Sequence, residues 1–219
     1  NISRRRFLLS TNALLGGLLI AESTTAGNVV NLLDFGSPLM IPENYSPTVW
    51  FTMQGGGETT IHVYRQELGQ HIGTAYAQIV AEELEVDWEK VNVDYPVVDT
   101  KSIARTGRQG TGGSNSVRTS FEPLSQAACI ARQFLVDAAA ELMGAEPSDC
   151  YVSQGVVFDP LYGQKMSYAE ILAQTSIEHE IAPEELAAAK LKDKSDYKVI
   201  GQPYQALDLP EKLNGKARF

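Results

Sequence analysis

Apolar and polar positions follow two periods along the chain, and the shorter period marks its strands. Residues 48–53 and 59–64 are rich in β-branched and aromatic side chains, and Gly55, Gly56 and Gly57 separate the two runs. This arrangement predicts a β-hairpin with the glycines in its turn. Another strand is predicted in "KVNVDYPVV", where valines alternate with polar residues.

The longer, helical period occurs twice. After residue 72, one stripe of the predicted helix contains Ile72, Tyr76, Ile79, Val80 and Leu84. A longer helix is predicted before Gly144, and its buried stripe would contain Leu124, Ala127, Ala128, Ala131, Leu135, Ala138, Ala139 and Leu142. Pro123 leaves its start open, because a proline is tolerated in the first turn after a Ser120 N-cap but would kink a helix that began near Ser116.

The C-terminal part also contains both predicted strands and predicted helices. Strands are predicted in "YVSQGVVFDP", a turn at Gly163, and helices over 167–174 and 183–190. From Lys198 onward the periodicity is weak, and 198–219 is interpreted as a linker into a further domain. The fold class is therefore mixed α/β (α+β), with a main domain over 28–197.

Residues 1–27 combine a basic cluster with an apolar run. Arg4, Arg5 and Arg6 precede a run from Leu8 to Ala21, which is shorter than the roughly 20 residues that a bilayer span needs. The order Arg-Arg-x-Phe-Leu in residues 4–8 resembles the twin-arginine export signal. An N-terminal helix retained on the domain is the alternative. The export interpretation predicts a periplasmic protein.

Composition narrows the function classes. Hydrophobic residues make up 43% and charged residues 21% of the 219 residues, as in soluble globular proteins. The formal charge is −9 although three arginines are concentrated at the N-terminus, so nucleic-acid binding is not expected. Cys129 and Cys150 are too few for an iron–sulfur cluster and would be either free thiols or a disulfide. His62, His71 and His179 lack metal-ligand spacing, so no protein-ligated metal is expected.

Two glycine-containing loops precede the two predicted long helices, "QELGQHIG" and "GRQGTGGSNS". Free N–H groups and the helix dipole favour an anion at such a position, and glycines let the backbone approach it. Neither loop contains Gly-Lys-Ser/Thr or a clean G-x-G-x-x-G, so neither ATP nor NAD is favoured. Charge at the second loop would come from Arg105, Arg108 and Arg118, and its Ser114, Asn115 and Ser116 supply hydrogen-bonding groups. Ordinary glycine turns are the alternative.

In order and spacing, these two loops and their flanking segments resemble the xanthine dehydrogenase-like molybdenum hydroxylases. The similarity is greatest to the molybdopterin-binding subunit of periplasmic aldehyde dehydrogenases and to the isoquinoline 1-oxidoreductase beta subunit. That branch usually has Glu-Met-Gly-Gln-Gly in the first loop and Gly-Gly-Ser-x-Ser in the second. The resemblance implies that the cofactor is bound by Gly69, Gln70, His71, Gly110, Gly112, Gly113, Ser114, Asn115 and Ser116. His71 departs from the usual glycine.

The resemblance also implies cofactors and partners. It points to a molybdenum-containing molybdopterin cytosine dinucleotide, shared with further domains of the subunit, and to water-dependent oxidation of an aldehyde or an N-heterocycle. It covers the first third of such a subunit, and the family's catalytic glutamate lies in the remainder, so no catalytic residue is expected here. Expected partners are the remaining molybdopterin domains, a small [2Fe-2S] subunit and a membrane-associated haem-containing cytochrome c, at the outer face of the cytoplasmic membrane. A non-catalytic exported binding module is the alternative.

Overall fold

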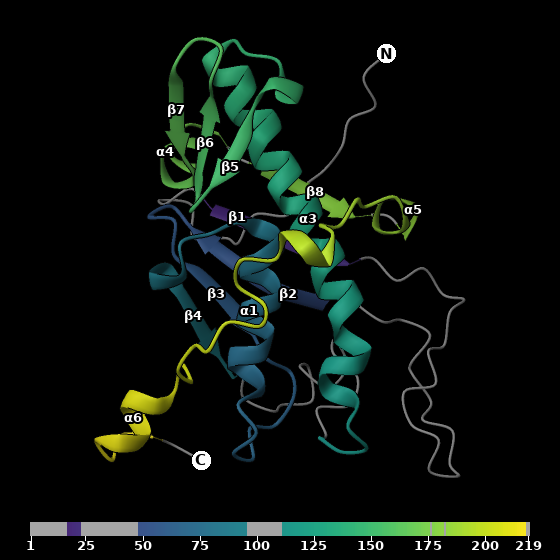
Figure 1. The fold of residues 1–219 in the computed structure, drawn as a ribbon, viewed down its shortest axis with the longest axis vertical. Coiled ribbons are helices and arrows are strands. Elements are labelled where there is room, and N and C mark those ends of the chain that lie inside the picture. Colours follow the sequence, from purple (N-terminus) through teal and green to yellow (C-terminus); the bar gives the residue numbers. More distant parts are fainter. Residues whose placement is uncertain (1–16, 23–47, 96–110, 176, 182, 218–219) are drawn as a thin grey trace.

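A computed structural model describes residues 17–22, 48–95, 111–175, 177–181 and 183–217, and they form a mixed α/β fold with two sheets (Figure 1). The larger sheet has the strand order β4-β3-β2-β1-β8, and the smaller has the order β5-β6-β7. Their bounds are β1 Gly17–Glu22, β2 Thr48–Gln54, β3 Thr59–His62, β4 Val91–Asp94, β5 Tyr151–Ser153, β6 Val156–Asp159, β7 Gln164–Ser167 and β8 Ile177–Ile181. The predicted fold class is confirmed.

The predicted hairpin is formed by β2 and β3, which pair antiparallel with Phe51 opposite Ile61. The outer pairs of the large sheet are parallel, β3 with β4 and β1 with β8. Phe51, Met53 and Ile61 point into the core because alternate side chains of a strand share a face, and all three are at most 2% exposed.

Two helices cover the same face of the large sheet, α1 (Ile72–Leu84) and α3 (Asn115–Met143) (Figure 1). Both were predicted, and their alanine- and leucine-rich faces join the strands in one hydrophobic core. Gly73 permits this close packing, because a Cβ there would overlap the Tyr95 hydroxyl and lie 2.7 Å from a methyl carbon of Val93.

The structure decides where α3 begins, and it corrects the predicted buried stripe at the end of this helix. Pro123 lies inside the helix, which begins at Asn115, so the earlier of the two possible starts is the observed one. Leu142 was expected in the buried stripe, but it is 39% exposed. Over 29 residues the buried face shifts around the helix, and Met143 packs against the core at the last turn instead.

The smaller sheet and α4 (Tyr168–Gln174) lie at one end of the molecule (Figure 1). Ser167 caps α4 in a capping box with Glu170, and the buried Tyr168 hydroxyl donates to the carbonyl of Leu84 at the end of α1 (2.8 Å). Strand β7 was not predicted, because its side chains are largely polar and exposed. Strand β8 was missed because its partner, β1, is distant in sequence.

The structure describes residues 17–22 of the N-terminal segment. Residues 17–22 form strand β1, where one alternative expected a helix, and the arginine cluster lies outside the described residues. Cys129 and Cys150 are free thiols. In the part of the chain that the structure describes, no helix is long and apolar enough to cross a membrane.

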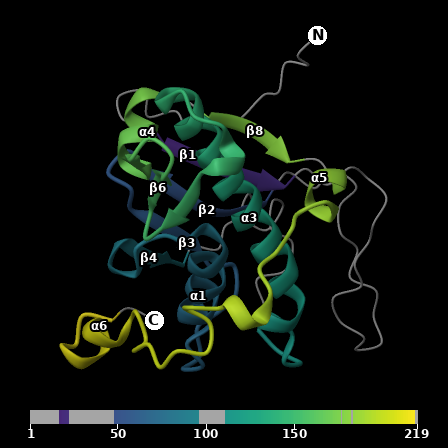
Figure 2. The same cartoon turned by 45° about the horizontal axis from the view of Figure 1, so that its top comes forward.

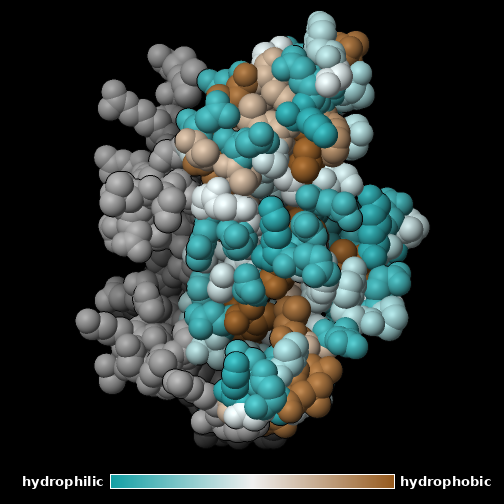
Figure 3. Space-filling model, turned by 90° about the vertical axis from the view of Figure 1, so that its left-hand side faces the viewer, coloured by the Kyte–Doolittle hydropathy of each residue, from teal (hydrophilic) through white to brown (hydrophobic). Residues whose placement is uncertain are grey.

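After β8, helix α5 (Pro183–Ala187) is shorter than predicted, and residues 190–208 then cross α3 and run along α1 to α6 (Leu209–Leu213) (Figures 1 and 2). We call residues 190–208 the strap. Apolar surface gathers near the α6 end of the face in Figure 3, and Leu213 of α6 is 79% exposed.

Candidate functional site

The two glycine loops lie side by side at the N-terminal ends of α1 and α3. The first loop comprises residues 66–71, and the described part of the second comprises residues 111–114. The Thr111 hydroxyl of the second loop donates to the carbonyl of Gln66 in the first (2.9 Å). Behind the loops, the Tyr76 hydroxyl contacts the Ser116 carbonyl at 2.9 Å and Ser120 Oγ at 2.7 Å. The structure thus brings together segments about 40 residues apart.

Glu67 occupies the anion position of the first loop. Its carboxylate accepts the N–H groups of Gly69 (2.7 Å), His71 (3.0 Å) and Ile72 (3.0 Å), and the Tyr95 hydroxyl lies 3.3 Å away. Desolvation alone would raise the pKa of Glu67, but these N–H donors outweigh it and lower the pKa. The expectation that both loops present free N–H groups is therefore wrong for the first loop.

The side chains of Gln70 and His71 in the first loop also have partners within the chain. The Gln70 amide accepts the N–H of Leu68 (2.6 Å) and donates to the Gln66 carbonyl (2.8 Å). His71 is the N-cap of α1 with φ 58° and ψ 41°, a left-handed conformation that favours glycine. Its Nδ1 lies 3.6 Å from Asp208 Oδ1 at the end of the strap. The backbone therefore gives a physical reason for the glycine that is usual here.

The second loop is more open. Gly112 is exposed, and a Cβ built on it would meet no atom within 4 Å. Gly113 and Ser114 both have positive φ, 61° and 53°, and Ser114 provides no side-chain cap for α3. Gly110 lies outside the described residues.

In the first turn of α3, Asn115 is buried and Arg118 is exposed. The Asn115 N–H donates to the Gly112 carbonyl (3.3 Å), and the Asn115 side chain is nearly buried. Its amide oxygen accepts from the Arg118 guanidinium. Arg118 therefore brings a positive charge to this helix end, whereas Arg105 and Arg108 lie outside the described residues.

One group of side chains has the composition of a metal site. Single ligand atoms of Glu67, His71 and Asp208 lie within 4.8 Å of one another, beside a surface pocket lined by Gln66, Glu67, Leu68, Gly69, His71 and Lys212. However, Glu67 already accepts three N–H groups, and the Lys212 ammonium lies 2.6 Å from Asp208 Oδ2. A cation there would compete with an ammonium for one carboxylate and with N–H donors for the other, so we assign no metal to this group.

The second loop fits a phosphate-bearing cofactor better than the first. The N-terminus of the 29-residue α3 lacks a side-chain cap, an acidic residue is absent from its first turn, and Gly112 leaves space beside it. At the first loop, the ionised Glu67 would repel a phosphate. Its loop backbone at Gly69, where a Cβ would also meet no atom within 4 Å, can approach an uncharged part of a ligand.

Sequence reasoning missed Glu67, which governs the first loop. Glu67 lies five residues before Ile72, outside the N-cap and N3 positions at which capping residues are recognised in a sequence. Its carboxylate reaches the N–H groups of His71 and Ile72 because the loop folds back on the start of α1.

Comparison with known proteins identifies a family and several relatives of this chain. A family model described as a molybdopterin cofactor-binding domain matches residues 27–209. The membrane-bound aldehyde dehydrogenase [pyrroloquinoline-quinone] of Gluconacetobacter polyoxogenes is 36% identical over 220 residues, covering 100% of this chain and 27% of that protein. The isoquinoline 1-oxidoreductase subunit beta of Brevundimonas diminuta is 29% identical over 205 residues, covering 80% of this chain and 26% of that protein.

Among solved structures, a Cu,Mo-CO dehydrogenase aligns with 72% of this chain and 19% of its own, at 20% identity and a TM-score of 0.49. The chain spans about a quarter of the length of the first two curated relatives. Because the family model covers most of the chain, the protein belongs to the molybdopterin cofactor-binding domain family.

Proposed function

We propose that this chain is the cofactor-cradling part of a molybdenum hydroxylase that oxidises aldehydes to carboxylic acids. The observation that carries the proposal is the pair of adjacent loops, of which the second presents the uncapped N-terminus of α3 beside the open Gly112. The aldehyde substrate class is supported by the 36% identity to an aldehyde dehydrogenase over the whole chain.

Each loop has its own role in this proposal. The N–H groups at the start of α3 hold the phosphates of a molybdopterin cytosine dinucleotide, and Gly112 and Gly113 admit them close to the backbone. The first loop, shaped by Glu67, contacts an uncharged part of the same cofactor through its backbone at Gly69. When bound, the cofactor supplies the two-electron oxidation in which water provides the oxygen atom.

Further domains and subunits complete the proposed enzyme. The remaining molybdopterin domains would supply the catalytic base, and a small [2Fe-2S] subunit and a haem-containing cytochrome c would take up the electrons. The arginine cluster, Arg4 to Arg6, supports export by the twin-arginine route to the outer face of the cytoplasmic membrane. The apolar surface at the α6 end of the face in Figure 3, together with the exposed Leu213 of α6, supports a contact with another domain, because a contiguous apolar surface favours burial.

Two other functions have specific support. The isoquinoline 1-oxidoreductase relative favours an N-heterocycle as substrate. The aldehyde dehydrogenase relative is named for pyrroloquinoline quinone, which would be a different cofactor. A phosphate site at the start of α3 favours molybdopterin over this quinone, because the quinone carries carboxylates and no phosphate.

Cofactor analysis of the purified complex tests the proposal. We expect molybdenum and CMP, the latter released by acid, in equal amounts per copy of this chain, with aldehyde-dependent reduction of an electron acceptor. Pyrroloquinoline quinone without molybdenum would refute the molybdopterin assignment. The presence of neither cofactor would indicate a binding module. Turnover of N-heterocycles but not aldehydes would replace the substrate class alone.

A further inference from the structure

A row of polar side chains on α1 binds the strap by its backbone. Thr74, Gln78 and Glu82 are spaced four residues apart, so they lie on one side of the helix. The strap runs antiparallel to α1 along this row. Residues 198–200 meet Glu82 near the end of the helix, and Leu207 meets Thr74 near its start.

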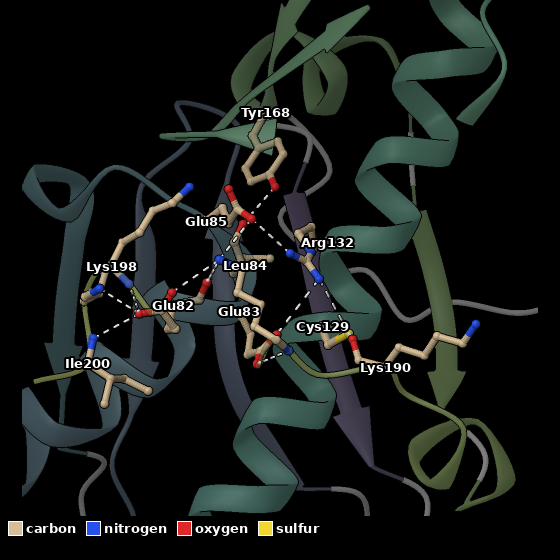
Figure 4. A network of polar contacts seen from close by, with 12 residues as sticks. Glu82, Glu83, Leu84, Glu85, Cys129, Arg132, Tyr168, Lys190, Lys198 and Ile200 are labelled. Atoms are coloured by element: carbon tan, nitrogen blue, oxygen red, sulfur yellow. Dashed lines mark hydrogen bonds and ion pairs between the residues drawn. The ribbon is translucent and has the colours of Figure 1, made fainter. Parts of the chain in front are cut away.

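Glu82 makes the most extensive contact with the strap (Figure 4). One oxygen, Oε2, accepts the N–H groups of Lys198 (2.9 Å), Val199 (2.7 Å) and Ile200 (3.0 Å). The other oxygen lies 3.3 Å from the Lys192 ammonium. The Glu82 side chain is 0% exposed, and a charge buried so completely is tolerated only when it is paired and hydrogen-bonded.

The other two side chains extend the attachment. Gln78 Nε2 donates to the carbonyls of Val199 (3.3 Å) and Gln202 (3.2 Å), and Thr74 Oγ1 accepts the N–H of Leu207 (3.0 Å). Apart from the Lys192 ammonium, every strap atom in these contacts with Thr74, Gln78 and Glu82 belongs to the backbone. The path of the strap along residues 198–207 is therefore determined by side chains of α1 that bind its backbone.

The strap ends at the first glycine loop. Asp208 follows Leu207 directly, and its Oδ1 lies 3.6 Å from His71 Nδ1 and has no hydrogen-bond partner among the described residues. His71 is in turn held by its own N–H to Glu67. A continuous series of contacts therefore links Glu82, the strap, Asp208 and the first loop.

We propose that Glu82 and the strap position the first glycine loop for the cofactor, with Asp208 and His71 as the point of contact. This inference rests on the proposed function for the identity of the ligand, but the link between strap and loop exists without it. Glu82 is a positioning residue, because it touches neither the loop nor the ligand.

Amide hydrogen exchange in the complete enzyme, followed by mass spectrometry, tests the link. For Glu82→Gln we expect exchange at residues 198–200 at least tenfold faster than in the wild type, because the amide accepts fewer N–H groups than a carboxylate. Exchange at residues 69–72 should rise severalfold as well, and the bound cofactor per folded complex should fall.

Two matched variants separate positioning from general destabilisation. Glu83→Gln changes the neighbouring carboxyl, which is 1% exposed and accepts only the Lys192 N–H of the strap, so residues 198–200 and 69–72 should keep their wild-type exchange. Asp208→Ala removes the contact with His71 but leaves Glu82 in place. It should therefore speed exchange at 69–72 and not at 198–200.

Each contrary outcome has a distinct meaning. Unchanged exchange at 198–200 in Glu82→Gln would refute the attachment, and faster exchange there with an unaffected first loop would refute the positioning role. Faster exchange at both sites in Glu83→Gln would show that any buried substitution loosens the region. Wild-type enzyme without molybdopterin would refute the proposed function, while the exchange data would still decide whether the strap and the loop are linked.

Discussion

The N-terminal ends of α1 and α3 follow similar glycine loops but differ in charge. A carboxylate of the chain neutralises the first end, whereas the second keeps the partial positive charge of its helix dipole. At α1, the carboxylate of Glu67 accepts the N–H groups of Gly69, His71 and Ile72. At α3, Ser114 gives no side-chain cap, and no acidic residue lies in the first turn. A glycine loop before a helix is thus not enough to define an anion site, because the chain can supply the anion itself.

This difference in charge is the reason why we propose different cofactor contacts for the two loops. A carboxylate that already neutralises a helix N-terminus would repel phosphate, so our proposal gives the first loop only a backbone contact with the cofactor. An N-terminus without a cap retains its partial positive charge for a ligand.

Placing a carboxylate in the second loop should make it resemble the first. We expect Gly112→Glu to lower the cofactor content of the folded complex at least tenfold, because the new charge competes with phosphate at α3. The fold should tolerate the change, since Gly112 is exposed and has no positive φ.

Gly112→Gln is the matched control, equal in size but uncharged. A similar loss in both variants would show that bulk excludes the cofactor, and full occupancy in both would remove the second loop from the site. Gly113 is the less useful position, because its φ of 61° makes any side chain strain the turn.

Gly73→Ala should loosen the base of the first loop. The added methyl would overlap the Tyr95 hydroxyl and lie close to Val93, and overpacking of this kind costs about 1–3 kcal/mol. We expect a lower midpoint of thermal unfolding for the complex and faster hydrogen exchange at residues 69–72. An unchanged midpoint would show that α1 moves away from β4 at little cost.

Glu67→Gln should destabilise the first loop by about 1–2 kcal/mol, the usual effect of losing charge-assisted hydrogen bonds and a helix cap. The effect should depend on pH. Because the folded-state pKa of Glu67 is lowered from 4.5, its stabilisation is present above that value and is lost as the pH falls through the folded pKa.

Unfolding of wild type and Glu67→Gln should therefore differ at pH 7 and converge below pH 4.5. A difference that stayed constant across this range would assign the effect to shape instead of charge. The cofactor phosphates are not expected to bind more tightly at pH 7, since the amide still fills the position.

His71→Gly should have the smallest effect on stability. Glycine would relieve a left-handed conformation that costs a non-glycine residue roughly 1 kcal/mol, but it would remove the partly exposed contact with Asp208. We expect the midpoint of unfolding to change little or to rise slightly. A large fall would show that the imidazole contributes more to the loop than its geometry indicates.

Local pattern in the sequence was sufficient for most of the elements. Hairpin β2–β3 and the helices α1 and α3 were predicted because their apolar spacing repeats over many consecutive residues. Pro123 left the start of α3 open, since both positions satisfy local rules and only packing against α1 selects the longer helix. Strand β7 was missed because it has no apolar alternation.

By itself, the sequence determined which segments have the apolar period of a strand and which have that of a helix, and where the two glycine loops lie. Through the resemblance of these loops to known loops, it also indicated the type of cofactor. Tertiary structure decided which loop has room for an anion, because the carboxylate of Glu67 is directed to its acceptor position only when the loop folds back on α1. It also decided the role of Glu82. The sequence pattern places this glutamate outside the apolar stripe of α1 and so predicts a solvent-facing side chain. Its partners, the N–H groups of residues 198–200, lie more than 110 residues away, and no local pattern records such a contact.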